Sequence, residues 1–160
     1  IGDVEQAIVL VIPEGLEEET ITRLSRVGFD HTLGYLKGGF KTWIAEGNEY
    51  DTVNQITAAN LKTELESDIP VFDVRKENEF LSERLPMAKN SPLDSINSHL
   101  NDFPQDKLFY IHCAGGYRSM IAASILKSRG IHNFVDVIGG FGAIKEAELP
   151  LTEFVCPSTL

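Results

Sequence analysis

Residues 110–119 read YIHCAGGYRS: an apolar run leads to a cysteine, and two glycines and an arginine follow. The apolar residues before the cysteine have the composition of a buried strand, and a helical pattern begins near Ser119. Cys113 therefore stands at the end of a predicted strand, ahead of two glycines and Arg118. Parallel α/β sheets place their ligands at this edge, where strands end and helices begin. The stretch predicts an α/β protein with a site centred on a cysteine.

The loop from Cys113 to Arg118 has the composition that stabilises a thiolate. Gly115 and Gly116 can adopt positive φ, which lets the loop curl with its amides pointing inward. The positive end of the next helix, capped by Ser119, and the charge of Arg118 would favour an anion at the same place. We therefore expect a cysteine pKa below its usual value of about 8.5. The alternative is a buried structural cysteine beside an incidental glycine turn.

The size of the loop separates two chemistries. Residues 114–117 lie between Cys113 and Arg118, which gives a CX4R spacing. Cysteine phosphatases use a CX5R loop, whose extra residue opens a ring of amides wide enough for phosphate. The shorter loop favours a single sulfur atom over a tetrahedral oxyanion. The spacing thus favours sulfur transfer over phosphatase or arsenate reductase chemistry.

The chain contains an internal repeat. Residues 7–47 resemble residues 107–146: each segment has an apolar strand, a glycine-containing loop, a helix, a second strand and Gly-Gly-Phe before another helix. Chance similarity between two βαβ units is the alternative. We predict the C-terminal half of a degenerate module in residues 1–48, whose loop at 12–15 is shorter and lacks cysteine. A complete module is predicted in residues 49–160.

The complete module has a front half that the first copy lacks. Its sequence predicts a strand at 53–56, a helix capped by Thr57, a buried strand at 69–74, a helical segment at 75–81 and a helix near 94–100. Strands that alternate with helices indicate a parallel sheet covered on both faces.

Three pieces of the sequence resemble rhodanese-like sulfurtransferases. They are Asp73-Val74-Arg75 with Glu79-Phe80 beyond, the loop 113–118, and Gly-Gly-Phe at 139–141. The resemblance covers about residues 50–150 and implies a rhodanese-like α/β fold, with a five-stranded parallel sheet and helices on both faces, preceded by the back half of a second such module. Residues 84–88, RLPMA, depart from the family's usual His-Ile-Pro-Gly-Ala, which affects the edge of the pocket.

The stretch CAGGYRS is similar to the second rhodanese module of fusions that carry a metallo-β-lactamase-like domain and are related to persulfide dioxygenases. In those fusions a cysteine-free rhodanese module comes first. The resemblance therefore implies such a metal-binding domain in the full-length protein, although this chain has no HxHxDH-type cluster.

The resemblance also implies a reaction and the residues that carry it. Cys113 would take a sulfane sulfur from thiosulfate, a persulfide or a polysulfide and pass it to a thiol or to cyanide, while Arg118 would orient an anionic donor. Asp73 and Arg75 would support the loop from a neighbouring strand end. The substrate-binding loop would comprise Ala114, Gly115, Gly116, Tyr117 and Ser119. The alternative is a non-catalytic module that carries persulfide or binds a partner.

Composition narrows the remaining classes of function. The net charge is −10, from 24 acidic and 14 basic residues, and such a surface repels the phosphates of nucleic acid. The longest apolar run, residues 7–12, is too short to span a membrane. We therefore expect a small sulfur-containing substrate as partner, without nucleic acid or membrane, and homo-oligomers are compatible with the sequence.

Cysteine usage indicates the redox setting. Cys113 and Cys156 are the two cysteines, and neither has metal-ligand spacing with the other or with the four histidines. We expect no metal, no cofactor and a reducing, cytoplasmic location that keeps Cys113 as a thiol. Cys156 is interpreted as a bystander in the tail.

Overall fold

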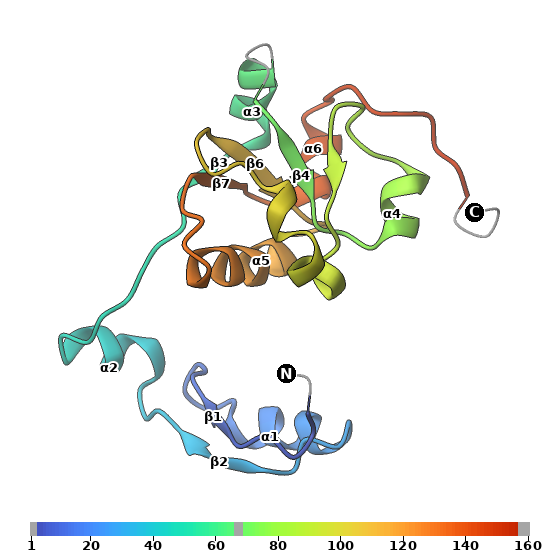
Figure 1. The fold of residues 1–160 in the computed structure, drawn as a ribbon. Coiled ribbons are helices and arrows are strands. Elements are labelled where there is room, and N and C mark those ends of the chain that lie inside the picture. Colours follow the sequence, from blue (N-terminus) through green and yellow to red (C-terminus); the bar gives the residue numbers. More distant parts are fainter. Residues whose placement is uncertain (1–2, 66–68, 157–160) are drawn as a thin grey trace. The chain divides into compact units, whose positions relative to one another are not determined.

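The structure is a computed structural model that describes residues 3–65 and 69–156. Contacts divide the chain into two compact units, Ile1–Thr52 and Val53–Leu160 (Figure 1). The second unit holds the cysteine loop, and its architecture explains where that loop lies.

The sheet of the second unit has five strands in the order β3-β7-β6-β4-β5, and all neighbouring strands run parallel. The strands are β3 (Gln55–Ile56), β4 (Val71–Asp73), β5 (Lys89–Asn90), β6 (Phe109–His112) and β7 (Phe134–Val137). This confirms the predicted parallel sheet. The strand predicted at 53–56 is shorter than expected.

Helices cover both faces of the sheet. They are α3 (Ala58–Glu64), α4 (Glu77–Ser82), α5 (Tyr117–Ser128) and α6 (Gly140–Glu146). Figure 1 shows α5 on one face and α6 on the other. Side chains on β6 alternate: Phe109 and Ile111 join a core with α5, and Tyr110 joins a core with α3 and α6. Cys113 is the next residue after β6, and its side chain lies on the same face of the sheet as α5.

Of three local predictions, one is wrong. The helix expected near 94–100 is present as two 3-10 segments, η2 (Leu93–Ser98) and η3 (Leu100–Asp102). Ser119 is not the cap of α5, because Gly116 occupies that position in the left-handed region with φ of 104°. Thr57 does cap α3, since its hydroxyl accepts a hydrogen bond from the backbone N–H of Asn60 at 3.2 Å.

The first unit has a two-stranded parallel sheet and two helices. These are β1 (Ile8–Leu10), α1 (Glu17–Ser25), β2 (Thr32–Tyr35) and α2 (Gly39–Ala45). Among its described residues only Leu10 and Gly39 are buried. The element order is the same as that of β6, α5, β7 and α6 in the second unit.

The glycine that begins each last helix locates the cysteine's counterpart. A Cβ on Gly39 would lie 2.6 Å from the carbonyl oxygen of Ile12, and a Cβ on Gly140 would meet the carbonyl oxygen of Cys113. Ile12 therefore occupies in the first unit the place that Cys113 has in the second. The loop after Ile12 is not shorter than its counterpart, since residues 13–16 precede α1 whereas residues 114–116 precede α5.

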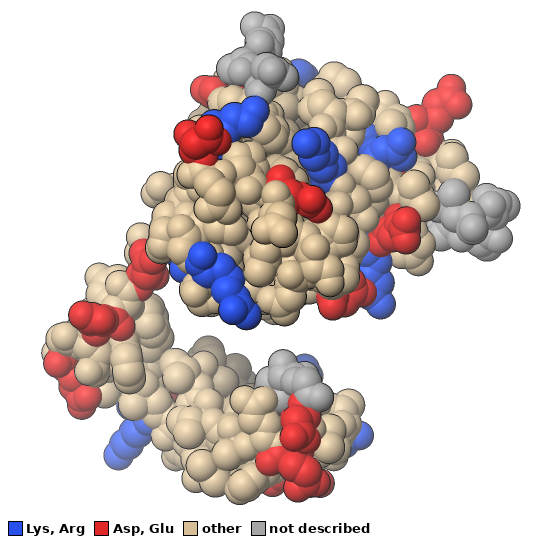
Figure 2. Space-filling model, in the orientation of Figure 1, with Lys and Arg blue, Asp and Glu red and all other residues tan. Residues whose placement is uncertain are grey.

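On the face that Figure 2 shows, Lys and Arg side chains are interspersed with Asp and Glu. Within the described part of the chain, no helix is both long enough and apolar enough to cross a membrane.

Candidate active site

Cys113 lies directly after β6, and only 1% of its surface is exposed. The backbone N–H of Gly116 donates a hydrogen bond to its Sγ at 3.1 Å. His112 lies on the opposite face, as the strand alternation predicts, where its ring stacks on Phe141 with 18° between the planes. The sulfur is therefore enclosed by its own loop and by α5.

The environment of the thiol lowers its pKa. Burial opposes ionisation and is the largest single influence, but hydrogen bonds outweigh it. They come from the hydroxyl and the backbone N–H of Ser119 and from the backbone N–H groups of Gly116 and Gly115. The direction agrees with the expectation from the sequence. The hydroxyl of Ser119 does not cap the helix: it lowers the pKa of the thiol and also lies 3.0 Å from the carbonyl oxygen of Gly116.

The start of α6 holds the loop from behind. The backbone N–H of Phe141 donates to the carbonyl of Cys113 at 2.7 Å, and that of Gly142 donates to the carbonyl of Ala114 at 3.0 Å. Gly140 lies between them with φ of 56°, so close to the Cys113 carbonyl that a side chain has no room. Gly-Gly-Phe at 139–141 is therefore part of the wall of the site.

Arg118 forms a bidentate ion pair with Glu79 of α4. Its Nη1 lies 2.6 Å from Glu79 Oε2 and its Nη2 lies 2.9 Å from Oε1, with both side chains about one-third exposed. Hydrogen bonding to this guanidinium lowers the pKa of Glu79. The pKa of Arg118 is raised, first by Glu79 and also by the charge of Cys113. The expected role of Arg118 toward an anionic donor stays a prediction.

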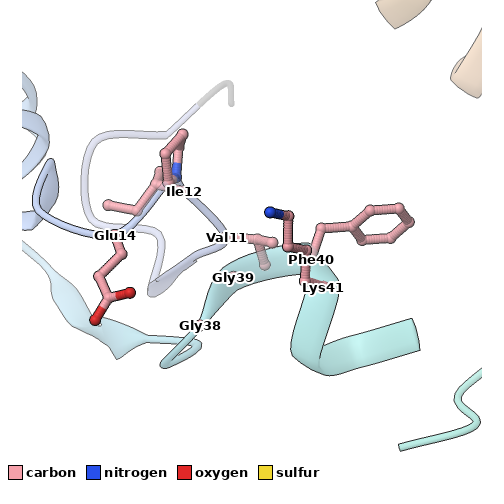
Figure 3. Close-up of a pocket in the computed structure, with 8 residues that line it drawn as sticks. Val11, Ile12, Glu14, Gly38, Gly39, Phe40 and Lys41 are labelled. Carbon is pink, nitrogen blue, oxygen red and sulfur yellow. The ribbon is translucent and has the colours of Figure 1, made fainter. Parts of the chain in front are cut away.

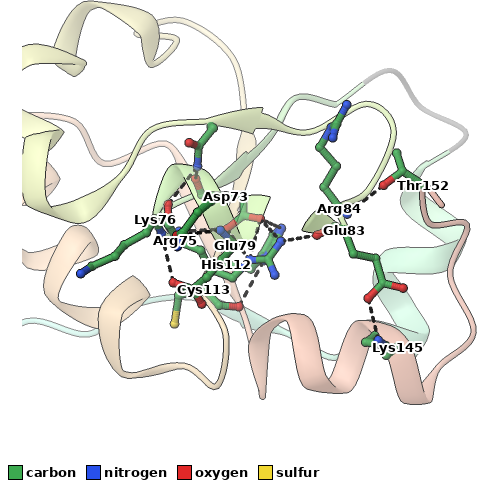
Figure 4. Close-up of polar contacts among 12 residues, drawn as sticks. Asp73, Arg75, Lys76, Glu79, Glu83, Arg84, His112, Cys113, Lys145 and Thr152 are labelled. Carbon is green, nitrogen blue, oxygen red and sulfur yellow. Dashed lines mark hydrogen bonds and ion pairs between the residues drawn. The ribbon is translucent and has the colours of Figure 1, made fainter. Parts of the chain in front are cut away.

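Asp73 and Arg75 form a buried pair at the end of β4, next to β6 (Figure 4). Arg75 Nη2 lies 2.6 Å from Asp73 Oδ2, and a second nitrogen, Nε, lies 2.8 Å from the same oxygen. Arg75 also donates to the carbonyl of Glu83 at 2.8 Å, and its guanidinium lies 3.8 Å above the Phe141 ring. The pair thus links β4 to the helix that holds the loop.

His112 adds a neutral group to this network. Burial lowers its pKa, although Asp73 works in the opposite direction. Its Nε2 lies 3.9 Å from Asp73 Oδ2 and has no hydrogen-bond partner among the described residues. The buried ring lies on the same side of the sheet as the Asp73–Arg75 pair, and its Nδ1 lies 3.3 Å from the carbonyl oxygen of Cys113, so it is suited to packing rather than to proton transfer (Figure 4).

Two cavities flank the loop. One, of about 360 Å³, is lined by Gly115, Gly116 and Tyr117 and by the end of β7. The other, of about 230 Å³, is lined by Arg118 and Lys76 together with apolar residues and Asp94. Tyr117 is 89% exposed and therefore edges the first cavity without packing into the core.

A further cavity of about 330 Å³ lies in the first unit (Figure 3). Ile12, Gly39 and Phe40 are among the residues that line it. It corresponds in position to the cysteine loop of the second unit, but an isoleucine stands where the thiol would be. This cavity therefore has no nucleophile of its own at that position.

Two residues near the loop were not among the predicted site residues. Glu79 belongs to one of the segments that resemble the rhodanese family, and this resemblance is the feature of the sequence that could have identified it as a site residue. Asp136, on β7, is 1% exposed and lines the first cavity, and nothing in its sequence context indicates this position. Cys156 is exposed and forms no disulfide with Cys113.

Comparison with known proteins identifies the class to which this fold and site belong. A family model, the rhodanese-like domain, matches residues 57–147, which is more than half of the chain. The chain belongs to the rhodanese-like domain family. The family match confirms the resemblance that the sequence indicates, and it includes the cysteine loop.

Individual relatives are named for sulfur transfer or sulfur carriage. The chain is 39% identical over 72 residues to the adenylyltransferase and sulfurtransferase uba4 of Ogataea parapolymorpha, covering 44% of this chain and 18% of that protein. It is 26% identical over 105 residues to the putative sulfur carrier protein YrkF of Bacillus subtilis, covering 61% and 57%. The chain thus spans less than two thirds of both relatives.

A solved structure has the same fold. A rhodanese-related protein from Thermoplasma volcanium is 29% identical and superposes with a TM-score of 0.57, covering 62% of this chain and 97% of that one. The matching region thus corresponds to nearly the whole of that protein, and the relatives of this chain include proteins named as a sulfurtransferase and as a putative sulfur carrier.

Proposed function

We propose that the chain is a sulfurtransferase that moves a sulfane sulfur through a persulfide on Cys113. One observation carries the proposal: the Cys113 sulfur accepts an N–H from its own loop, and hydrogen bonds lower its pKa despite burial. A structural cysteine in an apolar core would have a raised pKa instead. Hydrogen-bonded and close to a cavity, this thiol is suited to be a nucleophile.

The first half of the reaction forms the persulfide. The Cys113 thiolate attacks the outer sulfur of a donor such as thiosulfate, a new S–S bond forms, and the bond to the inner sulfur breaks. With thiosulfate the leaving group is sulfite, which departs with the electron pair. The N–H groups that stabilise the thiolate are placed to stabilise the charge of the persulfide.

The second half returns the enzyme to its starting state. An acceptor thiolate or cyanide attacks the terminal sulfur, the Cys113–sulfur bond breaks, and the electron pair returns to the Cys113 thiolate. No oxidant or reductant is consumed, because the sulfane sulfur only changes partner. Covalent catalysis of this kind gives ping-pong kinetics.

Arg118 has a defined place in this proposal. Its guanidinium lines the cavity of about 230 Å³ with Lys76, so an anionic donor would find two cations there. Glu79 already holds that guanidinium through two hydrogen bonds. A donor must therefore share Arg118 with Glu79 or displace it, which favours donors whose anionic group can compete with a carboxylate.

A carrier module is the second candidate, and a specific similarity favours it. The name of YrkF describes a putative sulfur carrier, and Cys113 is almost fully enclosed, as a carried persulfide would need to be protected. A carrier would form the Cys113 persulfide but would turn over slowly with free cyanide or thiols.

Steady-state assays test the proposal directly. The chain should form thiocyanate from thiosulfate and cyanide with parallel double-reciprocal lines, and Cys113→Ser should abolish this activity. Cys156→Ser is the matched control, because that thiol is exposed and outside the loop, and it should retain the activity. Equal loss in both variants, or turnover in Cys113→Ser, would be incompatible with the proposal.

We further propose that the two units form the tandem rhodanese part of a protein with a metallo-β-lactamase-like domain. The correspondence of β1, α1, β2 and α2 with β6, α5, β7 and α6 supports a tandem origin. The coding sequence upstream of this chain tests the proposal: an HxHxDH-type motif is expected there, and its absence would rule out the fusion.

A further inference from the structure

The cavity of about 360 Å³ has no role in the reaction as described so far. Gly115 and Gly116 of the cysteine loop form one side of it, and the ends of β3 and β7 form the other, at Gln55 and Asp136. Its volume lies at the lower end of the range for small-molecule sites, about 300–1,000 Å³. Because Gly115 and Gly116 belong both to the cysteine loop and to the wall of the cavity, a substrate that reacts at Cys113 has this cavity beside it.

Asp136 is the buried carboxylate among the residues that line this cavity. The residue is 1% exposed, and its Oδ2 accepts a hydrogen bond from the amide of Gln55 at 2.9 Å. Its second oxygen, Oδ1, is buried and has no hydrogen-bond partner among the described residues. Buried acceptors without partners are uncommon and cost free energy, so this carboxylate is suited to receive another donor.

The chemistry of the cavity selects a cationic N–H donor. A carboxylate only accepts hydrogen bonds, and none of the residues that line this cavity is Lys or Arg. The cavity on the other side of the loop, by contrast, has two cations, Arg118 and Lys76, and one carboxylate, Asp94. The two sides of the loop thus differ in the sign of the group that they would attract.

We propose that the cavity at Asp136 binds the ammonium group of a low-molecular-weight aminothiol, the acceptor that takes sulfur from Cys113. This assignment rests on the proposed function, because it names the acceptor class for that reaction. Gln55 covers the carboxylate in the unliganded protein. Its side chain is exposed, so it can turn away and let the ammonium group take its place.

A titration followed by amide NMR tests the site without any sulfur transfer. The full chain is titrated with 2-(methylthio)ethylamine and, separately, with 2-(methylthio)ethanol, which differ only in the ammonium group. The amide signals of Gly115, Gly116 and Gly139, which line the cavity, should shift saturably with the amine. A charge-assisted hydrogen bond predicts a Kd at least about tenfold lower for the amine. Equal affinities, or no saturable shift with either probe, would overturn the proposal.

Variants assign the effect to the carboxylate. Asp136→Asn keeps the size of the side chain and should remove the preference for the amine. Asp94→Asn removes the same charge from the cavity on the other side of the loop and should keep the preference. If both variants lose the preference for the amine to the same extent, that preference reflects the overall charge of the protein, and the proposal is wrong.

The amide spectrum would reveal whether Asp136→Asn is unfolded. A third variant tests the site even in that case. Gln55→Ala removes the amide that covers the carboxylate and should bind the amine several-fold more tightly. Unchanged or weaker binding would contradict the assigned role of Gln55 as a cover. Because the probes carry no transferable sulfur, failure of Cys113 to form a persulfide would refute the proposed function separately. If the amine binds but Cys113 forms no persulfide, the ammonium site would stand, and the claim that its ligand is the sulfur acceptor would be wrong.

Discussion

Cys113 and Arg118 close the same loop, yet the structure gives their side chains different partners. The sulfur receives neutral donors from the loop and from Ser119, and the guanidinium pairs with Glu79. The stabilisation of the thiolate therefore depends mainly on hydrogen bonds, with the nearby cation adding to it. The guanidinium of Arg118 is already paired with Glu79, so its role toward an anionic donor stays a prediction.

The hydroxyl of Ser119 gives a prediction at the scale of one residue. Ser119→Ala should raise the pKa of Cys113, because a hydrogen bond that lowers it is lost. The thiolate fraction at a given pH then falls, so the acidic limb of the kcat/KM profile should move to higher pH. The measurement is the pH dependence of persulfide formation with thiosulfate.

The same helix provides a matched control. Ser128 donates its hydroxyl to the carbonyl three residues earlier, as Ser119 does, but it lies at the far end of α5. Ser128→Ala should leave the acidic limb where it is. A profile that is unchanged in Ser119→Ala would contradict the role assigned to that hydroxyl.

At this scale the sequence predicted the groups that are adjacent along the chain. Cys113, its glycines and Arg118 occupy one continuous loop, so their proximity follows from the sequence. The partnership of Arg118 with Glu79 joins residues 39 positions apart and depends on how α4 packs. Asp136 approaches the loop only because β7 pairs with β6. Neither relationship has a local pattern that could reveal it.

The contact between the loop and α6 gives a prediction at the scale of elements. Gly140→Ala should distort the loop, because the added Cβ meets the carbonyl of Cys113, and both stability and sulfurtransferase activity should fall. Gly130→Ala is the control: its φ of 83° is also left-handed, but a Cβ there has no neighbour within 4 Å. It should lose roughly 1–2 kcal/mol of stability and keep its activity. Urea unfolding and the thiocyanate assay measure the two effects, and equal activity in both variants would contradict this account.

The buried ion pair beside the loop gives a second prediction at this scale. Asp73→Asn leaves the charge of Arg75 buried without its partner, and breaking such a pair costs roughly 3–5 kcal/mol. Glu19→Gln breaks an exposed pair with Arg23 and should change the free energy of unfolding by no more than about 0.5 kcal/mol. Urea unfolding followed by circular dichroism compares them. A loss in Asp73→Asn as small as that of the control would show that the pair is not structural.

Elements with a strong local signal were predicted better than those that depend on packing. The parallel strands and the helix after the cysteine follow from apolar runs and glycine positions. The helix expected near 94–100 is instead 3-10, although Leu93 and Ile96 have spacing that suits either form. Ser95 departs from helical geometry with φ of −120°, and packing of Ile96 against α5 and the sheet decides the outcome.

At the scale of the whole molecule, the two units differ in how much core they have. The second unit has buried apolar clusters on both faces of its sheet, whereas the first buries Leu10 and Gly39 among its described residues. The internal repeat is the basis on which two modules, with a boundary at 48/49, are predicted from the sequence, and the contacts divide the chain at 52/53. The interpretation of the first as half of a degenerate module stays a proposal.

This difference predicts how the units behave when separated. Residues 53–160 should fold cooperatively alone, and residues 1–52 should not, because a short chain with so little buried surface cannot offset its loss of conformational entropy. Amide NMR spectra of the two fragments provide the measurement. A dispersed spectrum for residues 1–52 would show that this half is an independent fold and would contradict the account.

The most direct test of the central claim is the intact mass of the protein after treatment with thiosulfate. The wild-type chain and Cys156→Ser should each gain the mass of one sulfur atom, and cyanide should remove it. Cys113→Ser should gain nothing. A wild-type mass that stays unchanged with thiosulfate and with glutathione persulfide, or a gain that persists in Cys113→Ser, would show that Cys113 does not carry sulfur.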